Sequence, residues 1–307
     1  MTVINMLGLK DAGIAVGDEQ SSNRLRKYNV SQKVVPLGEN CVYGGSGSTD
    51  GLKNVYRASN RMVNEHGERQ KLTVGDISGI VSQNIIDLKR SDVGRNLMAN
   101  LGISIEDALS GTHNGRPLDS EVKSRIASII QGSDERMGMA VLVGGITPKG
   151  FEIYTQDSGG YLAQSSTPYV SVGSGSDESN KVLSQFVIGL PRDQRLQIDP
   201  KLGIAKVIEA TNASTQINVG VGGIPSIAYV TRNGILQPGE DETKLATELV
   251  ASLPTGILSK EFVYNSTFDL ITNGASFSQT HQAMREVAGD KIGDLELFLR
   301  GYRISKD

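Results

Sequence analysis

Thr2 is the residue whose type and position in the sequence are best suited to chemistry. It follows Met1 directly, and threonine is small enough for ordinary methionine aminopeptidases to remove a methionine before it. Removal would leave a threonine whose free α-amine lies beside its own hydroxyl. Such a hydroxyl is a nucleophile with a built-in general base. The start of the chain therefore predicts an N-terminal nucleophile, although many proteins begin Met-Thr without this function.

The residues after Thr2 predict a β-hairpin that would bring a carboxylate beside it. Two apolar runs, 3–9 and 12–17, flank the turn residues Lys10 and Asp11, which is the pattern of two strands joined by a tight turn. Because such a hairpin returns the chain to its starting point, we expect Asp18 to lie next to Thr2. An opening hairpin is common, so the rest of the chain has to decide whether the two residues act together.

The composition favours a β-rich protein and argues against nucleic acid as a partner. Of the 307 residues, 38% are apolar and 5% aromatic, and the 36 glycines suit tight turns and close approaches of the backbone. The length allows one large domain, or one domain with extensions. The net charge of −3 and the lack of a long basic run predict no nucleic-acid binding.

Neither a cofactor nor a membrane anchor is indicated. Cys41 is the single cysteine and stands in an apolar context, so we expect a buried side chain and no disulfide or cysteine-based zinc site. The histidines show no ligand-like spacing, and we predict no metal and no organic cofactor. The sequence has no signal peptide and no apolar run long enough to span a bilayer, which favours a cytoplasmic protein.

Hydrophobic periodicity predicts strands on both sides of a helical middle. After a polar loop at 21–28 we expect a second hairpin over 33–43, a flexible turn over 44–51, and a helix capped by Thr49 or Asp50. The later expected elements are helices over 74–89 and 118–131, strands over 139–145, 150–155, 161–165 and 169–172, helices over 178–186 and 202–212, a strand over 224–230, a turn at 233–234 and a helix over 243–253. Strand runs that enclose helix runs predict an α+β sandwich of packed sheets with helices outside.

Seven pieces of the sequence occur in the order found in proteasome β-subunits and their simpler bacterial ring-peptidase relatives. They are Thr2-Val3-Ile4, Ala15-Val16-Gly17-Asp18-Glu19-Gln20, Lys33 at a strand start, Tyr43-Gly44-Gly45-Ser46-Gly47 before a helix, Val143-Gly144-Gly145, Gly173-Ser174-Gly175-Ser176 and Val221-Gly222-Gly223. From Thr2 to about Leu253 the chain therefore resembles the proteasome-type N-terminal-nucleophile (Ntn) hydrolases. The resemblance implies a four-layer αββα sandwich of two antiparallel sheets face to face, with helices on both outer faces.

The resemblance also implies a role for each site residue. Thr2 Oγ would be the nucleophile with its α-amine as base, Lys33 would favour the neutral amine and stabilise the alkoxide, and Asp18 would hold Lys33 in place. The N–H of Gly45, or of Gly47 in the alternative register, would donate to the oxyanion, and Ser174 would orient the Thr2 amine. Without the resemblance, Lys33 and Asp18 could be a surface ion pair and Ser174 a plain helix N-cap.

The chain departs from the family pattern in three places. Asn218 stands where the family has an aspartate, and its uncharged amide would support the Thr2 amine less well. No propeptide precedes Thr2, so loss of Met1 alone is expected to free the site. A hydrolase domain over 2–253 carries an insertion at about 91–117, and an extension of unknown role over 254–307 is expected to hold its own strand and helix. These additions would block ring stacking or form a docking surface.

We therefore expect a threonine-type endopeptidase that hydrolyses peptide bonds through an acyl ester on Thr2. Its substrate would be a peptide or an unfolded protein, bound in a cleft lined by 20–28. Three alternatives stay open: a transpeptidase or protein ligase that uses the same acyl-enzyme, a non-catalytic structural subunit, which Asn218 favours, and an amidase that acts on a small molecule. The family also implies a homo-oligomeric ring, with an unfoldase ATPase as partner only if folded proteins are the substrate.

Overall fold

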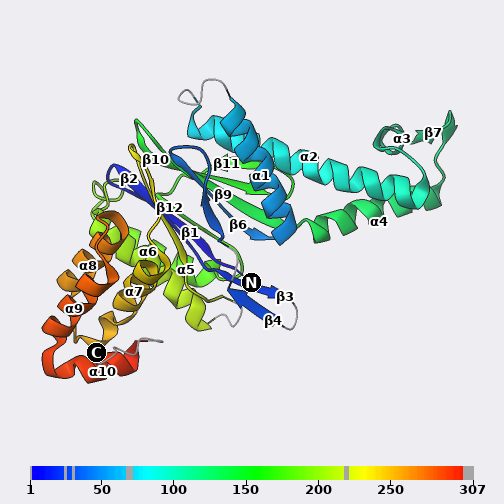
Figure 1. The fold of residues 1–307 in the computed structure, drawn as a ribbon. Coiled ribbons are helices and arrows are strands. Elements are labelled where there is room, and N and C mark those ends of the chain that lie inside the picture. The colour runs from blue at the N-terminus through cyan, green and yellow to red at the C-terminus, as the bar shows by residue number, and fades with distance from the viewer. Residues whose placement is uncertain (1, 24–25, 30–31, 67–71, 218–220, 300–307) are drawn as a thin grey trace.

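The chain folds into a mixed α+β structure built on two antiparallel sheets (Figure 1). The computed structural model describes residues 2–23, 26–29, 32–66, 72–217 and 221–299. The first sheet has the strand order β12-β1-β2-β13-β14, and the second has the order β11-β10-β9-β6-β5. The strands of the first sheet are β1 (Ile4–Leu9), β2 (Ala12–Gly17), β12 (Tyr169–Val172), β13 (Ser226–Thr231) and β14 (Gly234–Leu236). Those of the second are β5 (Val34–Pro36), β6 (Cys41–Gly47), β9 (Met139–Thr147), β10 (Gly150–Asp157) and β11 (Leu162–Gln164).

The two faces of β1 contact different layers of the structure. Ile4 and Met6 pack into a buried cluster shared with strands of the second sheet, whereas Leu7 and Leu9 belong to a cluster shared with helices. Successive side chains of a strand point to opposite faces, so these two sets of apolar side chains bury both faces of β1. The first sheet therefore has the second sheet on one side and helices on the other.

Helices cover the outer face of each sheet. α1 (Thr49–Glu65) and α2 (Val74–Leu101) share a buried cluster with β6 and β9 of the second sheet. The cluster on the first sheet takes in α5 (Ser176–Gly189), α6 (Pro200–Ile217), α7 (Glu240–Ala251), η2 (Leu253–Thr255), α8 (Lys260–Thr272), α9 (Phe277–Ala288) and α10 (Ile292–Phe298). The short turn η3 (Gly289–Lys291) joins α9 to α10. None of the helices in the described part of the chain is both long and apolar enough to cross a membrane.

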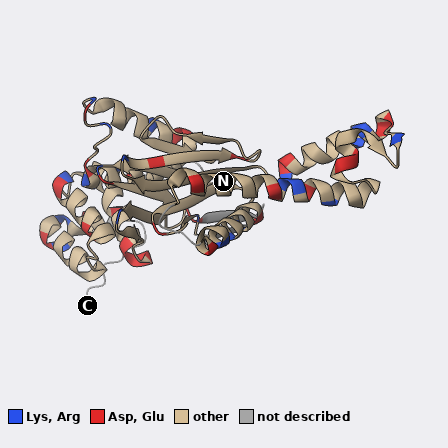
Figure 2. Cartoon of the chain, turned by 90° about the horizontal axis from the view of Figure 1, so that it is seen from above, with Lys and Arg blue, Asp and Glu red and all other residues tan. Residues whose placement is uncertain are grey.

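A helical arm projects from the body (Figure 1). It consists of the second half of α2, followed by α3 (Ile105–Ser110), β7 (Thr112–His113), β8 (Arg116–Pro117) and α4 (Ser120–Arg136). A small apolar cluster around Leu97, Ile103 and Ile126 holds it together. Charged residues of both signs line the arm (Figure 2), and Arg136 on α4 pairs with Asp92 on α2 at 2.9 Å. The arm is thus a helical hairpin with its own small core.

Three local expectations about the first half of the chain are wrong. The polar loop expected at 21–28 is a pair of strands, β3 (Gln20–Asn23) and β4 (Arg26–Asn29), which lack the apolar alternation that would have marked them. The glycines expected to form a flexible turn over 44–51 continue β6 as far as Gly47. The N-cap of α1 is Ser48 rather than Thr49 or Asp50, because Ser48 accepts from the Gly51 N–H.

The insertion and the extension also differ from expectation. The helix expected over 74–89 runs on through Gly94 to Leu101, because its second half packs Leu97 against Ile126 of α4. It ends at Gly102, which has a left-handed conformation. The boundary expected near residue 91 therefore falls inside a helix. The strand expected after residue 254 is absent from the described residues 254–299, which are helical and pack into the same cluster as β1 and β2.

Candidate active site

The opening hairpin places Asp18 beside Thr2, as the sequence predicts. β1 and β2 pair from Leu9↔Ala12 to Ile4↔Gly17, so a two-residue turn brings the chain back to its start. Asp18 then closes the hairpin through two bonds to the residue next to Thr2. Its N–H donates to the Val3 carbonyl at 3.1 Å, and its Oδ1 accepts from the Val3 N–H at 2.8 Å.

Lys33 joins Asp18 to the hydroxyl of Thr2. It lies immediately before β5, and its Nζ donates to Thr2 Oγ1 at 2.9 Å and to both carboxylate oxygens of Asp18 at 3.0 Å. The side chain of Asp18 is 1% exposed and that of Lys33 is 10% exposed. The reading of these two residues as a surface ion pair is therefore wrong, because a surface pair would remain in water.

Burial and charge act in opposite directions on this pair. Burial raises the pKa of Asp18, and the charge of Lys33 with hydrogen bonds from Val3, Lys33 and Gly222 opposes the rise. Burial lowers the pKa of Lys33, and Asp18 and Glu19 oppose the fall. Removing two charges from water can cost more than their mutual attraction returns. An ammonium whose charged form is destabilised is a stronger proton donor, which suits a partner oxygen that becomes negative.

Ser174 contacts Thr2 from the loop between β12 and α5. Its Oγ accepts from the Thr2 N–H at 3.0 Å. While Met1 is attached, this donor is a peptide nitrogen. Once Met1 is removed, the same nitrogen is the α-amine of Thr2. The N-cap of α5 is Gly175, with no side-chain capping bond, so the reading of Ser174 as a plain N-cap is wrong.

The glycines beside Ser174 hold the other end of Thr2. The Gly175 N–H donates to the Thr2 carbonyl at 3.2 Å. Gly173 has a φ of +102°, and a Cβ there would collide with the Thr2 carbonyl oxygen. Only glycine combines this backbone conformation with so close an approach. The loop at residues 173–175, which we call the clasp, therefore forms hydrogen bonds with both the N–H and the carbonyl of Thr2.

Two buried serines that the sequence did not single out anchor this clasp. The Oγ of Ser214, on α6, donates to the Gly175 carbonyl at 2.6 Å and lies 2.8 Å from the Oγ of Ser179 on α5. Both side chains are fully buried. In the sequence, Ser214 is only a polar residue in the buried stripe of a helix, and its contact across 39 residues has no local signal.

The N–H of Gly45 points toward the edge of β6 where Lys33 lies. The Cys41 carbonyl accepts a hydrogen bond from the Leu37 N–H, on the side of β6 that faces β5. The Ser48 N–H donates to the Gly138 carbonyl, on the side that faces β9. Because the backbone groups of successive residues point to alternate sides of a strand, the N–H of Gly45 points to the same side as the carbonyl of Cys41, the side that faces β5. The pairing with β5 ends at Val34↔Gly44, so this N–H lies just past the end of β5. Its role as oxyanion donor, and the choice between Gly45 and Gly47, stay predictions.

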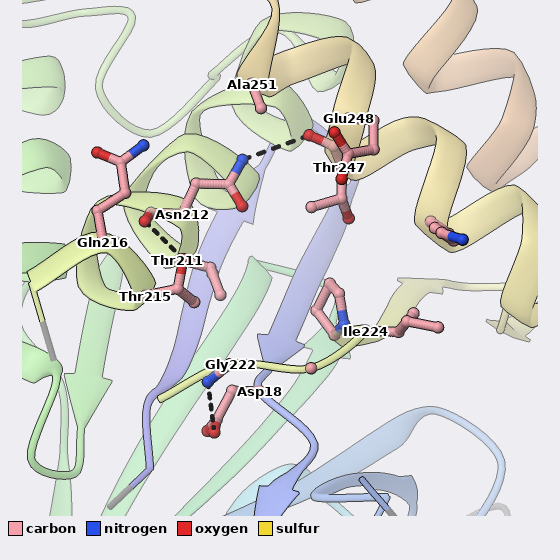
Figure 3. A pocket seen from close by; sticks show the side chains of 13 residues that line it. Asp18, Thr211, Asn212, Thr215, Gln216, Gly222, Ile224, Thr247, Glu248 and Ala251 are labelled. Carbon is pink, nitrogen blue, oxygen red and sulfur yellow. Dashed lines mark hydrogen bonds between the residues drawn. The ribbon is translucent and has the colours of Figure 1, made fainter. Parts of the chain in front are cut away.

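The late Gly-Gly turn also reaches the site. The Gly222 N–H donates to Asp18 Oδ2 at 3.5 Å (Figure 3), a contact that the sequence alone did not predict. Asn218, expected to support the Thr2 amine, lies outside the described residues. Only the backbone of β3 and β4 is described, so the expectation that side chains of 20–28 line a cleft stays a prediction.

Function has to be inferred from this arrangement. Comparison with protein-family models and with curated proteins gave no match. Among the described residues, no group of three or more His, Cys, Asp or Glu side chains could hold a metal ion. The site offers a hydroxyl, an ammonium, a buried carboxylate and a serine whose Oγ accepts a hydrogen bond from the Thr2 nitrogen.

Proposed function

We propose that this chain is a threonine-type peptidase of the proteasome-like Ntn-hydrolase kind, which cleaves peptide bonds through an acyl ester on Thr2. The observation that carries the proposal is the position of Lys33 Nζ, 2.9 Å from Thr2 Oγ1 and 3.0 Å from both oxygens of a buried Asp18. An ammonium fixed in advance against a hydroxyl stabilises the charge that develops when the hydroxyl attacks. A purely structural role for Thr2 gives no reason to bury two charges beside it.

In the proposed reaction, Thr2 Oγ attacks the carbonyl carbon of the substrate peptide bond. The α-amine that is freed when Met1 is removed takes the hydroxyl proton, directly or through a water, and delivers it to the leaving amine. An α-amine titrates at about 7.7–8.0 without perturbation, so it can act as a base near neutral pH. The ammonium of Lys33 stabilises the attacking oxygen, and the N–H of Gly45 donates to the oxyanion. Water then cleaves the ester, the Thr2 hydroxyl regains its proton, and the acid product leaves.

The same proposal extends to the fold and the assembly. A buried cluster shared by the two sheets and a helical layer on each outer face support the four-layer αββα sandwich of this family. We take 2–253 as the hydrolase domain. By family resemblance we propose a cytoplasmic homo-oligomeric ring that acts on peptides or unfolded proteins, with an unfoldase ATPase only for folded substrates.

Intact mass and an active-site probe test the proposal. We expect the mature chain to lack Met1 and to gain the mass of one epoxyketone, attached at Thr2, because this probe reacts with a hydroxyl and a free amine on the same residue. Peptide mapping locates the adduct. A chain that retains Met1 and gains no adduct would exclude the peptidase and leave a non-catalytic structural subunit.

Replacement of Gly173 by alanine is expected to lower the rate of adduct formation by about 100-fold, since misplacing a reacting group by about 1 Å has a cost of that size. The new Cβ would push on the Thr2 carbonyl and force alanine into a left-handed φ, which costs about 1–3 kcal/mol. Adduct kinetics and the urea unfolding midpoint measure the two effects. Gly189→Ala is the matched control, because nothing lies near its added Cβ. Equal reactivity of Gly173→Ala and the wild type would mean that the clasp does not position Thr2.

A further inference from the structure

A small polar network lies between the first sheet and α6, at the fully buried side chain of Asn5 on β1. Its Oδ1 accepts a hydrogen bond from the Ser171 hydroxyl on β12 at 2.6 Å, and its Nδ2 donates to Thr211 Oγ1 on α6 at 2.9 Å. The Thr211 hydroxyl in turn donates to the Val207 carbonyl at 2.9 Å. We call Ser171, Asn5 and Thr211 the Asn5 network; all three side chains are buried.

Hydrophobic packing alone does not explain polar side chains at this place. The buried cluster that joins the first sheet to its helices is apolar, with Leu7, Val16, Val207 and Ile208 among its members. A buried amide costs free energy unless it is hydrogen-bonded, whereas an apolar side chain needs no partner. A fully bonded network specifies one arrangement of the elements it joins, because any other register leaves its donors and acceptors unpaired. The Asn5 network therefore fixes α6 relative to β1 and β12.

Each of the three elements that the Asn5 network joins leads to Thr2. Asn5 itself lies three residues after Thr2 in the same extended segment. β12 ends at Val172 and continues directly into the clasp. α6 carries Ser214, whose Oγ donates to the Gly175 carbonyl at 2.6 Å, and the Gly175 N–H donates to the Thr2 carbonyl at 3.2 Å. A shift of α6 on the sheet would therefore move the clasp against Thr2.

We propose that Asn5 is a positioning residue for Thr2, which fixes α6 and β12 and, through Ser214, the clasp. Because Asn5 is fully buried, substrate cannot contact it, and its loss should slow the attack by Thr2 without weakening the binding of substrate. The effect on the reactivity of Thr2 rests on the proposed function. The effect on the clasp does not, because it concerns hydrogen bonds that are present in the folded chain.

Epoxyketone labelling of Thr211→Val in the full chain tests the proposal. Valine keeps the shape of threonine and removes the hydroxyl that accepts from Asn5. We expect the maximal rate of adduct formation at Thr2 to fall at least about tenfold, because a small displacement of a reacting group has a cost of this order. The probe concentration that gives half the maximal rate should not change. Thr211→Ser keeps the hydroxyl and should be labelled at the wild-type rate.

Thr267→Val is the matched control. Thr267 is fully buried on α8, and its Oγ1 has no hydrogen-bond partner within the part of the chain that the structure describes. The variant therefore loses a buried hydroxyl without loss of a hydrogen bond, and we expect labelling at the wild-type rate. Labelling of Thr211→Val at the wild-type rate would overturn the role of Asn5. So would a loss of equal size in Thr211→Ser or in Thr267→Val.

Hydrogen exchange at the Gly175 N–H measures the position of the clasp without any reaction at Thr2. This N–H should exchange at least about tenfold faster in Thr211→Val than in Thr267→Val, because the carbonyl that accepts from it is held less firmly. Equal exchange in the two variants would overturn the positioning role. If wild-type Thr2 forms no adduct at all, the proposed function fails, and the exchange rates still decide whether the Asn5 network positions the clasp.

Discussion

Replacement of Thr2 by alanine is expected to abolish peptide cleavage and epoxyketone labelling, with a loss of roughly 10⁴–10⁶-fold in kcat/KM. This loss in kcat/KM is of the size measured when a catalytic nucleophile is removed from an enzyme in which nucleophile and base act as a unit. The backbone contacts of residue 2 with Ser174 and Gly175 do not involve its side chain, so the clasp should remain intact. Hydrolysis of a fluorogenic peptide and intact mass after labelling measure the two losses.

Thr2→Ser is the matched control for this variant. Serine keeps the hydroxyl that Lys33 Nζ contacts at 2.9 Å and removes only the methyl group. Alanine and serine are both small, so processing of Met1 should be the same in the two variants. We expect Thr2→Ser to be labelled and to retain measurable cleavage. Cleavage by Thr2→Ala at the wild-type rate would show that another group is the nucleophile.

The candidate site was predictable where it depends on local pattern. The apolar runs on either side of Lys10 and Asp11 set the length of the first hairpin, and the observed strands end within one residue of the expected ones. That length alone places Asp18 beside Thr2. Lys33 was assigned only through the family resemblance, because no periodicity indicates where a lysine before a short strand points.

The parts that were missed depend on contacts between distant segments. The second half of β6, residues 44–47, was expected to be a turn because glycines have no side chains to show a strand period. Glycines occupy these positions because of tertiary packing: a Cβ on Gly44 would crowd Ile4, and a Cβ on Gly45 would collide with Leu52. Ser214 and Gly222 reach the site from about 200 residues away from Thr2 and Asp18. Only the folded chain brings them close.

Replacement of Lys33 by methionine is expected to remove activity and to destabilise the protein by about 3–5 kcal/mol at neutral pH, because it leaves the buried carboxylate of Asp18 without its partner. Burial already raises the pKa of Asp18, and Lys33 is the strongest influence that opposes the rise. Without Lys33 the folded state holds the Asp18 proton more tightly than the unfolded state does. Stability is then greatest below the ordinary pKa of about 3.9 and falls as the pH rises through the folded-state pKa. Urea unfolding from pH 4 to pH 7 should therefore show a defect that grows with pH.

The double variant Asp18→Asn/Lys33→Met separates the charge from the packing. The side-chain amide oxygen introduced at position 18 can still accept a hydrogen bond from the Val3 N–H, as Asp18 Oδ1 does at 2.8 Å. No unpaired charge then remains buried. We expect most of the stability at neutral pH to return, the pH dependence to flatten and activity to stay absent. A double variant as unstable as Lys33→Met would assign the loss to packing of the lysine stem. Recovery of stability without activity would mean that the two charges, each of which burial disfavours, are retained for their effect on Thr2 Oγ1.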